Sequence, residues 1–189
     1  MKEEKEAKKD EERWRTPRDW VKTETYYLRT LKEQFYGPGR NNDDPAITSA
    51  RLLIPADAKT ILDVGSGSDG ADFTGQVDLG LGIDFHWLPY GDNSFDLIWA
   101  RHALEHSPMP FFALLEWRRV AKKYLLIILP ESIPYIAEYW GYWSCLPDFG
   151  WRALFKKANL KLLKDERGEW IHFTKDPEKM MEMRFLLQK

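Results

Sequence analysis

The middle of the chain alternates between short apolar segments and longer segments with helical periodicity. Several of the short segments are apolar at nearly every position, which is typical of strands buried on both faces of a sheet. Strands that alternate with helices form a parallel or mixed sheet covered by helices, so the sequence predicts an α/β fold. The expected strands are 60–64, short segments within 76–85, 95–100, 124–129, 161–166 and 169–175, and the expected helices are 45–53, 109–123 and 151–160.

The segments before and within this pattern differ from it in composition. Residues 1–16 mix charges of both signs with almost nothing apolar, so we expect a disordered tail or a frayed helix. We expect residues 17–58 to form an N-terminal helical cap and residues 59–175 to form the core of the α/β fold. An insertion rich in Trp and Tyr interrupts the core at 132–151.

Two features are expected at the C-terminal end. Arg167 and Gly168 separate two strand-like segments, which predicts a closing hairpin. Residues 176–189 begin with Asp-Pro and carry a Met and Leu face, which predicts a C-terminal helix. We expect this helix to pack on its own domain, with a homodimer through the helix or through the aromatic insertion as the alternative.

Composition narrows the possible partners. The chain has 189 residues and a formal net charge of −2, so it has no overall positive field to gather nucleic acid or an anionic membrane. Its longest apolar run, Tyr124 to Leu129, is far shorter than a membrane span. Its single cysteine, Cys145, cannot form an internal disulfide, and no leader opens the chain. We therefore expect a cytoplasmic protein that binds neither DNA nor membrane.

A glycine-rich loop follows the first strand of the core. Gly65, Gly67 and Gly70 fit the G-x-G-x-x-G fingerprint of nicotinamide and flavin enzymes, and Asp84 lies about 20 residues further on, where a ribose-binding acid is expected. That fingerprint also needs a helix that opens at the third glycine, because the helix N-terminus holds the phosphates. The segment from 71 to 76 is too short for such a helix. An adenosyl ligand without phosphates needs only the glycines and nearby carboxylates.

Three blocks of sequence resemble the class I S-adenosylmethionine-dependent methyltransferases, in particular the group known as type 11. They are ILDVGSGSDG at 61–70, IDFHWLPYGDNSFDLIWARHALEHSP at 83–108 and EWRRVAKKYLLIILPE at 116–131. The LPYGDNSFD segment at 88–96 is the strongest single signal. The resemblance implies a Rossmann-like, mostly parallel sheet of seven strands with one antiparallel closing strand, between helices on both faces in three layers. It also implies S-adenosyl-L-methionine as the cofactor and S-adenosyl-L-homocysteine as the product.

The same resemblance assigns cofactor-binding roles to residues at the strand ends. The glycine loop would shape the pocket for the methionine end, Asp78 would accept from the ribose hydroxyls, and Asp84 would accept from the adenine amine. The family has a full helix between the loop and the second strand, whereas this chain compresses the interval to 69–84. Asp78 and Asp84 therefore either divide the two roles, or Asp84 alone is the ribose acid. The implied cofactor-binding residues are Asp63, Gly65, Ser66, Gly67, Asp78, Asp84, Phe85 or Leu88 against the adenine ring, Ala100 and Arg101.

Two histidines after the third core strand allow two interpretations. His102 and His106 fit the H-x-x-E-H pattern of inverted zinc peptidases, where two ligands lie one helical turn apart. A catalytic zinc also needs a third ligand, and the acids that follow late in the chain, Glu166 and Glu169, belong to an expected surface hairpin. We therefore predict no metal site. The resemblance instead puts His102 at the methyl-transfer site, as a candidate catalytic residue or as a bridge between loops.

Methyl transfer from a sulfonium is an in-line displacement, so the protein mainly aligns the reacting atoms and excludes water. The acceptor is expected to be a small molecule, because the chain lacks the Asp/Asn-Pro-Pro-aromatic and Pro-Cys motifs of the DNA methyltransferases. Aromatic residues outside the core motifs are candidates for its pocket, although each could equally pack in the protein. These residues are Tyr27, Trp140, Tyr142 and Trp143. The alternatives are an oxidoreductase or hydrolase with a nucleotide cofactor, and a non-catalytic relative that binds the cofactor or a partner.

Overall fold

The computed structural model describes residues 45–66, 73–78, 83–131, 142–172 and 178–189. The chain divides into two compact units, Met1–Tyr36 and Gly37–Lys189, and every described residue belongs to the second. The expected tail and most of the expected N-terminal cap therefore lie outside the described residues. Among the described helices, none has the length and apolar character needed to cross a membrane.

The described residues form one sheet of six strands in the order β2-β1-β3-β4-β6-β5. The first four strands pair in parallel, and β6 is antiparallel to both of its neighbours, so that β5 again runs in the direction of the first four. The predicted α/β fold with one antiparallel strand is confirmed, whereas the predicted seven strands are not, since the described residues form six. The strands are β1 (Ile61–Val64), β2 (Gly75–Val77), β3 (Phe95–Arg101), β4 (Ala121–Pro130), β5 (Lys161–His172) and β6 (Glu178–Gln188).

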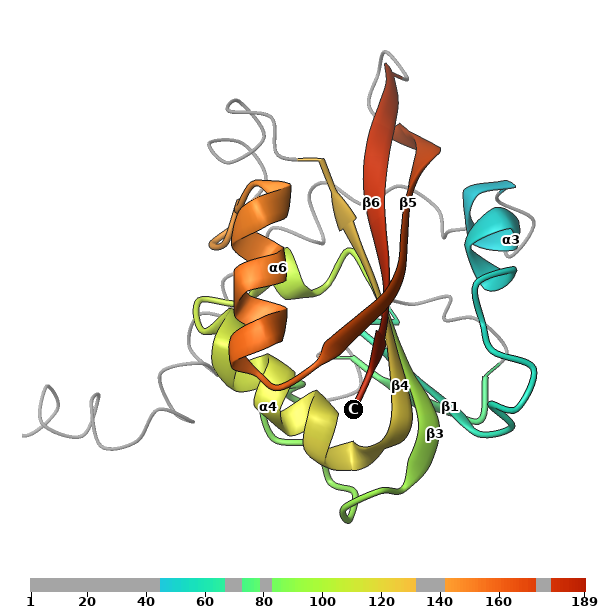
Figure 1. Ribbon diagram of the computed structural model, residues 1–189, viewed down its shortest axis with the longest axis vertical. Helices are drawn as coiled ribbons and strands as arrows, with labels where there is room; N and C mark the ends of the chain where they lie inside the picture. The colour runs from blue at the N-terminus through green and yellow to red at the C-terminus, as the bar shows by residue number, and fades with distance from the viewer. Residues whose placement is uncertain (1–44, 67–72, 79–82, 132–141, 173–177) are drawn as a thin grey trace, which may run out of the picture. The chain divides into compact units, whose positions relative to one another are not determined.

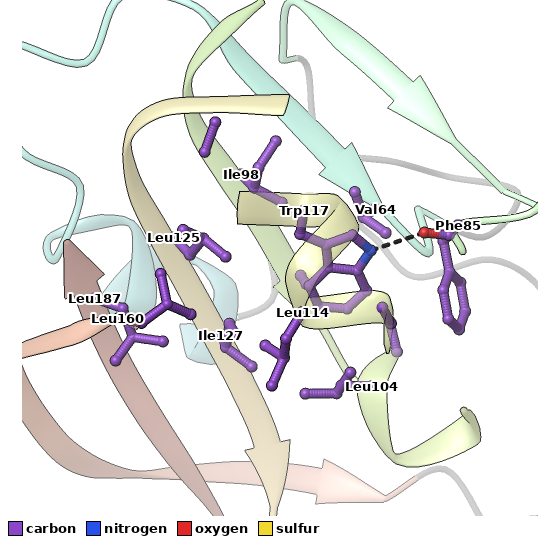
Figure 2. Packing of buried hydrophobic residues seen from close by; sticks show 14 of the residues in the cluster. Val64, Phe85, Ile98, Leu104, Leu114, Trp117, Leu125, Ile127, Leu160 and Leu187 are labelled. Atoms are coloured by element: carbon purple, nitrogen blue, oxygen red, sulfur yellow. Dashed lines mark hydrogen bonds between the residues drawn. The ribbon is translucent and has the colours of Figure 1, made fainter. Parts of the chain in front are cut away.

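Helices lie on both faces of this sheet, as Figure 1 shows, with α4 (Pro110–Val120) and α6 (Asp148–Lys157) on one face and α3 (Pro45–Arg51) on the other. Each face has its own hydrophobic cluster. On the side of α4 and α6, the Trp117 side chain is fully buried among aliphatic residues, and its indole N–H donates to the Phe85 carbonyl at 2.9 Å (Figure 2). The α3 cluster includes Trp99 and Ile128, which lie on the opposite face of the same strands.

Helix α4 follows from local sequence signals. Pro110 occupies the first turn, where its missing N–H costs nothing, and two arginines lie in the last turn, where the helix dipole favours positive charge. The buried residues recur at helical spacing: Ala113, Leu114, Trp117 and Val120. The helix therefore begins and ends close to the limits that the sequence predicts.

The C-terminal part of the chain differs from the prediction. Residues 178–188 form strand β6 and not the predicted helix. Met183 and Phe185 pack toward α6, while Glu182 and Leu186 face the side of α3, so β6 is buried on both faces. Its position between β4 and β5 thus overrides the helical preference of its Met, Glu and Leu residues.

The predicted hairpin at Arg167 and Gly168 is also wrong, because β5 runs unbroken from Lys161 to His172 and pairs with β6. Gly168 lies within the strand, opposite Glu182. A Cβ atom at this position would collide with the guanidinium of Arg184. The glycine therefore makes room for a buried arginine and does not mark a turn.

Replacement of Gly168 by Ala should lower the free energy of unfolding by more than about 2 kcal/mol, because the new methyl group displaces the buried Arg184. Urea denaturation of both proteins measures this difference. Gly91→Ala is the matched control, since a Cβ atom there meets only the Ser94 hydroxyl at 3.7 Å. Equal losses in the two variants would contradict this explanation of Gly168.

Candidate functional site

The turn after β1 lies across the end of β2. Gly65 adopts a left-handed φ of 75°, and its N–H donates to the Val77 carbonyl at 2.8 Å. The Ser66 N–H donates to the same carbonyl at 3.3 Å. A Cβ atom at Gly65 would lie 2.6 Å from the Ala103 Cβ, so both the backbone conformation and the close approach of the loop after β3 require glycine here.

The two candidate ribose and adenine acids lie near this turn. Asp78 follows Val77 directly, and the Ile83 N–H donates to the Asp78 carbonyl at 3.1 Å. This bond closes the short connection and brings Asp84 back to the carboxyl end of β2. The structure thus gathers Gly65, Asp78 and Asp84 at one edge of the sheet, whereas Gly67 lies outside the described residues.

Asp84 is the first member of a buried hydrogen-bonded chain. Its Oδ1 accepts from the His86 backbone N–H at 2.9 Å and lies 2.8 Å from the His86 ring Nδ1. The His86 Nε2 lies 2.7 Å from the Ser107 Oγ. The Oδ2 atom of Asp84 is buried and has no hydrogen-bond partner in the part of the chain that the structure describes. One oxygen of this carboxylate is therefore fixed, while the other keeps its capacity to accept.

The Leu-Pro-Tyr turn that follows is attached to α4. The Leu88 N–H donates to the Glu116 Oε1 at 2.8 Å, and Arg119 binds the same carboxylate and the Tyr90 carbonyl. Leu88 and Phe85 are only 5% and 9% exposed and belong to the hydrophobic core. Leu88 and Phe85, the predicted neighbours of adenine, therefore pack mainly against other core side chains. Glu116 and Arg119 of α4 fix the turn.

The last acid of the LPYGDNSFD segment lies at the other end of the sheet. The Asp96 Oδ2 accepts from the backbone N–H groups of Thr60 at 2.8 Å and Lys59 at 2.9 Å. These bonds, above all the one from Thr60, hold the pKa of Asp96 well below its usual range. Asp96 thus fixes the start of β1. The segment therefore begins beside the candidate site, at Leu88, and ends with a carboxylate that has a structural role.

The end of β3 carries a buried charged cluster. Arg101 Nε lies 3.1 Å and His102 Nε2 lies 3.2 Å from the Glu182 Oε2, and Arg184 Nε donates to the other oxygen at 2.8 Å. The His102 side chain is 2% exposed, and its φ of 51° places it in the left-handed region. Ala100 is likewise buried. The three residues predicted at the transfer site thus lie together, but His102 and Arg101 face Glu182.

Burial alone would raise the pKa of Glu182, but the hydrogen bond from His102 and the charges of His102, Arg101 and Arg184 outweigh it. Together they lower the pKa from 4.5 to about 2. Because the folded-state pKa is depressed, the ionised cluster stabilises the fold above about pH 4.5. That stabilisation is lost as the pH falls toward 2.

Glu182→Gln should therefore flatten the acid limb of the stability profile. The wild-type free energy of unfolding should fall between pH 4.5 and pH 2 by about 3 kcal/mol more than that of the variant, and the two curves should converge near pH 2. At pH 7 the variant should be less stable, because two buried arginines lose their counter-charge. Urea midpoints across this range measure the effect, with Glu131→Gln as control, since the Glu131 side chain is 48% exposed and its ion-pair partner is Arg167, which is not a member of the Glu182 cluster. Parallel curves for wild type and Glu182→Gln would contradict the assignment.

The two histidines of the H-x-x-E-H pattern do not lie one turn apart on an α-helix. His102 precedes a short 3-10 helix, η2 (Leu104–His106), and the His106 ring contacts the Tyr142 ring at 4.6 Å between centroids. Across the described ranges, no group of three or more His, Cys, Asp or Glu side chains is arranged to hold a metal ion. Nothing in this geometry therefore supports a zinc peptidase.

A small pocket lies beyond the end of β4. The backbone N–H groups of Trp143 and Ser144 donate to the Glu105 carbonyl at 2.9 and 3.0 Å, which attaches the aromatic segment to η2. Trp143, in this aromatic segment, is 48% exposed.

Cys145, which follows in the chain, lies in the pocket lining. Its partial burial, with a smaller effect of the Glu105 charge, raises the pKa of its thiol. The pocket is lined by Glu105, Leu129, Pro130, Glu131, Tyr142, Ser144, Cys145, Leu146 and Trp151.

Two of the predicted pocket residues, Tyr27 and Trp140, lie outside the described residues. Asp63 is buried within β1. Three members of the site region were not predicted from the sequence: His86, Ser107 and Glu182. His86 had a usable signal, since it follows Asp84 at a spacing that permits a side-chain bond, but Glu182 lay in a segment assigned to a helix.

Comparisons with known proteins agree with this fold. The family model of the methyltransferase domain matches residues 73–128. A candidate methyltransferase from Bacillus halodurans superposes with a TM-score of 0.59 at 12% identity, over 77% of this chain and 98% of its own. A SAM-dependent methyltransferase from Thermotoga maritima has a TM-score of 0.56 at 14% identity, over 75% of this chain and 86% of its own.

The [4+2]-cyclase SpnF has a TM-score of 0.56 at 18% identity, over 75% of this chain and 78% of its own. No curated protein matches the sequence of this chain. At these identities the structural likeness shows the fold alone. The fold is one that solved methyltransferases have. The family match includes the second sequence block and most of the third but not the first, so the resemblance to methyltransferases is confirmed over those two blocks.

Proposed function

We propose that this chain transfers the methyl group of S-adenosyl-L-methionine to a small-molecule acceptor at the carboxyl edge of β1, β2 and β3. The observation that carries the proposal is the gathering of the Gly65 turn, Asp78 and Asp84 at this edge, where open α/β sheets bind ligands. The methyltransferase family match and fold support the chemistry.

In this proposal Asp84 accepts a hydrogen bond from the adenine amine through Oδ2, the oxygen that has no partner among the described residues. Asp78 accepts from the ribose hydroxyls, and Gly65 and Ser66 border the methionine end. Leu88 and Phe85 support the adenine position from the core. Asp63, Gly67, Ala100 and Arg101 complete the proposed cofactor region.

The reaction itself needs alignment more than proton transfer. An in-line displacement at the methyl carbon is accelerated mainly when the acceptor, the carbon and the sulfur are held in one line away from water. The bond from His102 to Glu182 and the burial of its ring favour a positioning role at the end of β3 over proton abstraction from an acceptor. The acceptor would enter beside Tyr142, which lines the small pocket, and Trp143, which is 48% exposed.

Calorimetric titration with S-adenosyl-L-homocysteine and S-adenosyl-L-methionine tests the proposal. The wild-type protein should bind both ligands, and Asp84→Asn should weaken each by about ten- to a hundredfold, because a charged acceptor is lost. If Asp78 binds the ribose and Asp84 binds the adenine amine, Asp78→Asn should weaken binding to a similar extent. If Asp84 alone binds the ribose, Asp78→Asn should leave the affinity unchanged. Asp57→Asn is the control, since Asp57 is 51% exposed and pairs with Lys123.

Absence of binding by either ligand at millimolar concentration would overturn the proposal. Tight binding of NAD without any response to S-adenosyl-L-methionine would select the oxidoreductase alternative. Binding of S-adenosyl-L-homocysteine with no methyl transfer to any of a panel of amines, thiols and hydroxyl compounds would favour a non-catalytic relative or another reaction on this fold.

A further inference from the structure

The chain of Asp84, His86 and Ser107 is more enclosed than the rest of the candidate site. The side chains of His86 and Asp84 are 2% and 11% exposed, and Ser107 is fully buried. The chain spans two segments: Asp84 and His86 precede the Leu-Pro-Tyr turn, whereas Ser107 follows η2 after β3. It therefore connects the proposed adenine side of the site to the loop at the end of β3.

Hydrogen-bond chemistry gives this chain a direction. An ionised carboxylate oxygen can only accept, so the His86 Nδ1 donates to Asp84, and in the tautomer with its proton on Nδ1 the Nε2 accepts from the Ser107 hydroxyl. The Ser107 Oγ also accepts the Met109 N–H at 3.0 Å, and this second bond fixes the rotation of the hydroxyl. Ser107 thus fixes the ring of His86, and His86 holds the carboxylate of Asp84 by two bonds to one oxygen.

We infer that His86 and Ser107 are positioning residues that orient the Asp84 carboxylate so that its Oδ2 is preset to accept from the exocyclic amine of an adenosyl ligand. The inference rests on the proposed function. A carboxylate that is already held through one oxygen loses little further rotational freedom when its other oxygen binds a ligand. The folded protein has therefore already lost part of the side-chain entropy that binding would otherwise cost. The buried Oδ2, which has no partner among the described residues, is the acceptor that this arrangement prepares.

The same three residue types occur in serine hydrolases, where the serine attacks a substrate. Here the Ser107 side chain is fully buried and its Oγ is occupied by the Met109 N–H and by His86. A substrate carbonyl cannot reach an oxygen in that position. The geometry therefore favours orientation of Asp84 over nucleophilic catalysis.

Ser107→Ala tests the inference because it removes one oxygen from the chain and leaves Asp84 intact. Affinity for S-adenosyl-L-homocysteine should fall about tenfold in this variant and in His86→Phe. In an Asp84→Asn background the same substitutions should cause no further loss, because the group they orient is no longer a charged acceptor. If His86→Phe fails to fold, Ser107→Ala carries the test alone. Ser94→Ala, which removes an exposed hydroxyl bound to Gly91, is the matched control.

Competition with two nucleosides separates orientation from general loosening of the fold. Adenosine should bind Ser107→Ala more weakly than wild type, whereas purine riboside, which lacks the 6-amino group, should bind both equally. Equal losses for the two nucleosides, or losses that add to those of Asp84→Asn, would overturn the inference. If Asp84→Asn weakens binding and Ser107→Ala does not, the inference fails while the proposed function stands. Absence of any binding by wild type overturns both.

Discussion

The parallel pairing of β1 with β2 and β3 is the constraint on which the candidate site depends. Parallel strands end at the same edge, so the Gly65 turn, Asp78 and the loop after Arg101 meet there without long connections. The Val77 carbonyl ties the Gly65 turn to β2, and the Asp78 carbonyl ties the returning chain beside it. The parallel direction of the strands thus brings the candidate site residues together. Hydrogen bonds to the Val77 and Asp78 carbonyls hold the chain there, although the connections between these residues are short.

A second constraint comes from β6, which lies next to the edge strand β5. β6 is buried between β4 and β5 although it carries Glu182 and Arg184, because each charge meets an opposite charge within hydrogen-bonding distance. The same cluster holds His102 and so fixes the loop that approaches Gly65 through Ala103. Packing of the C-terminal strand and the geometry of the site are therefore coupled through the end of β3.

The central strands, α4 and the proximity of Gly65, Asp78 and Asp84 could be predicted from the sequence, because apolar runs, helical spacing and the glycine turn are local signals. The prediction failed at β6 and Gly168, since both depend on residues distant in sequence: β6 is a strand only between β4 and β5, and Gly168 is explained only by Arg184. His86 and Ser107 are 21 residues apart, so their contact was equally invisible. Asp78 and Asp84 were placed together because only a few residues separate them.

The central claim is that an adenosyl group binds at this edge with its amine on Asp84. A crystal structure of the chain with S-adenosyl-L-homocysteine tests it most directly. The account predicts the exocyclic nitrogen of adenine at about 3 Å from the Asp84 Oδ2, with the ribose beside Asp78 and the Gly65 turn at the methionine end. An adenosyl group bound elsewhere, or bound here with Asp84 turned away from it, would contradict the account.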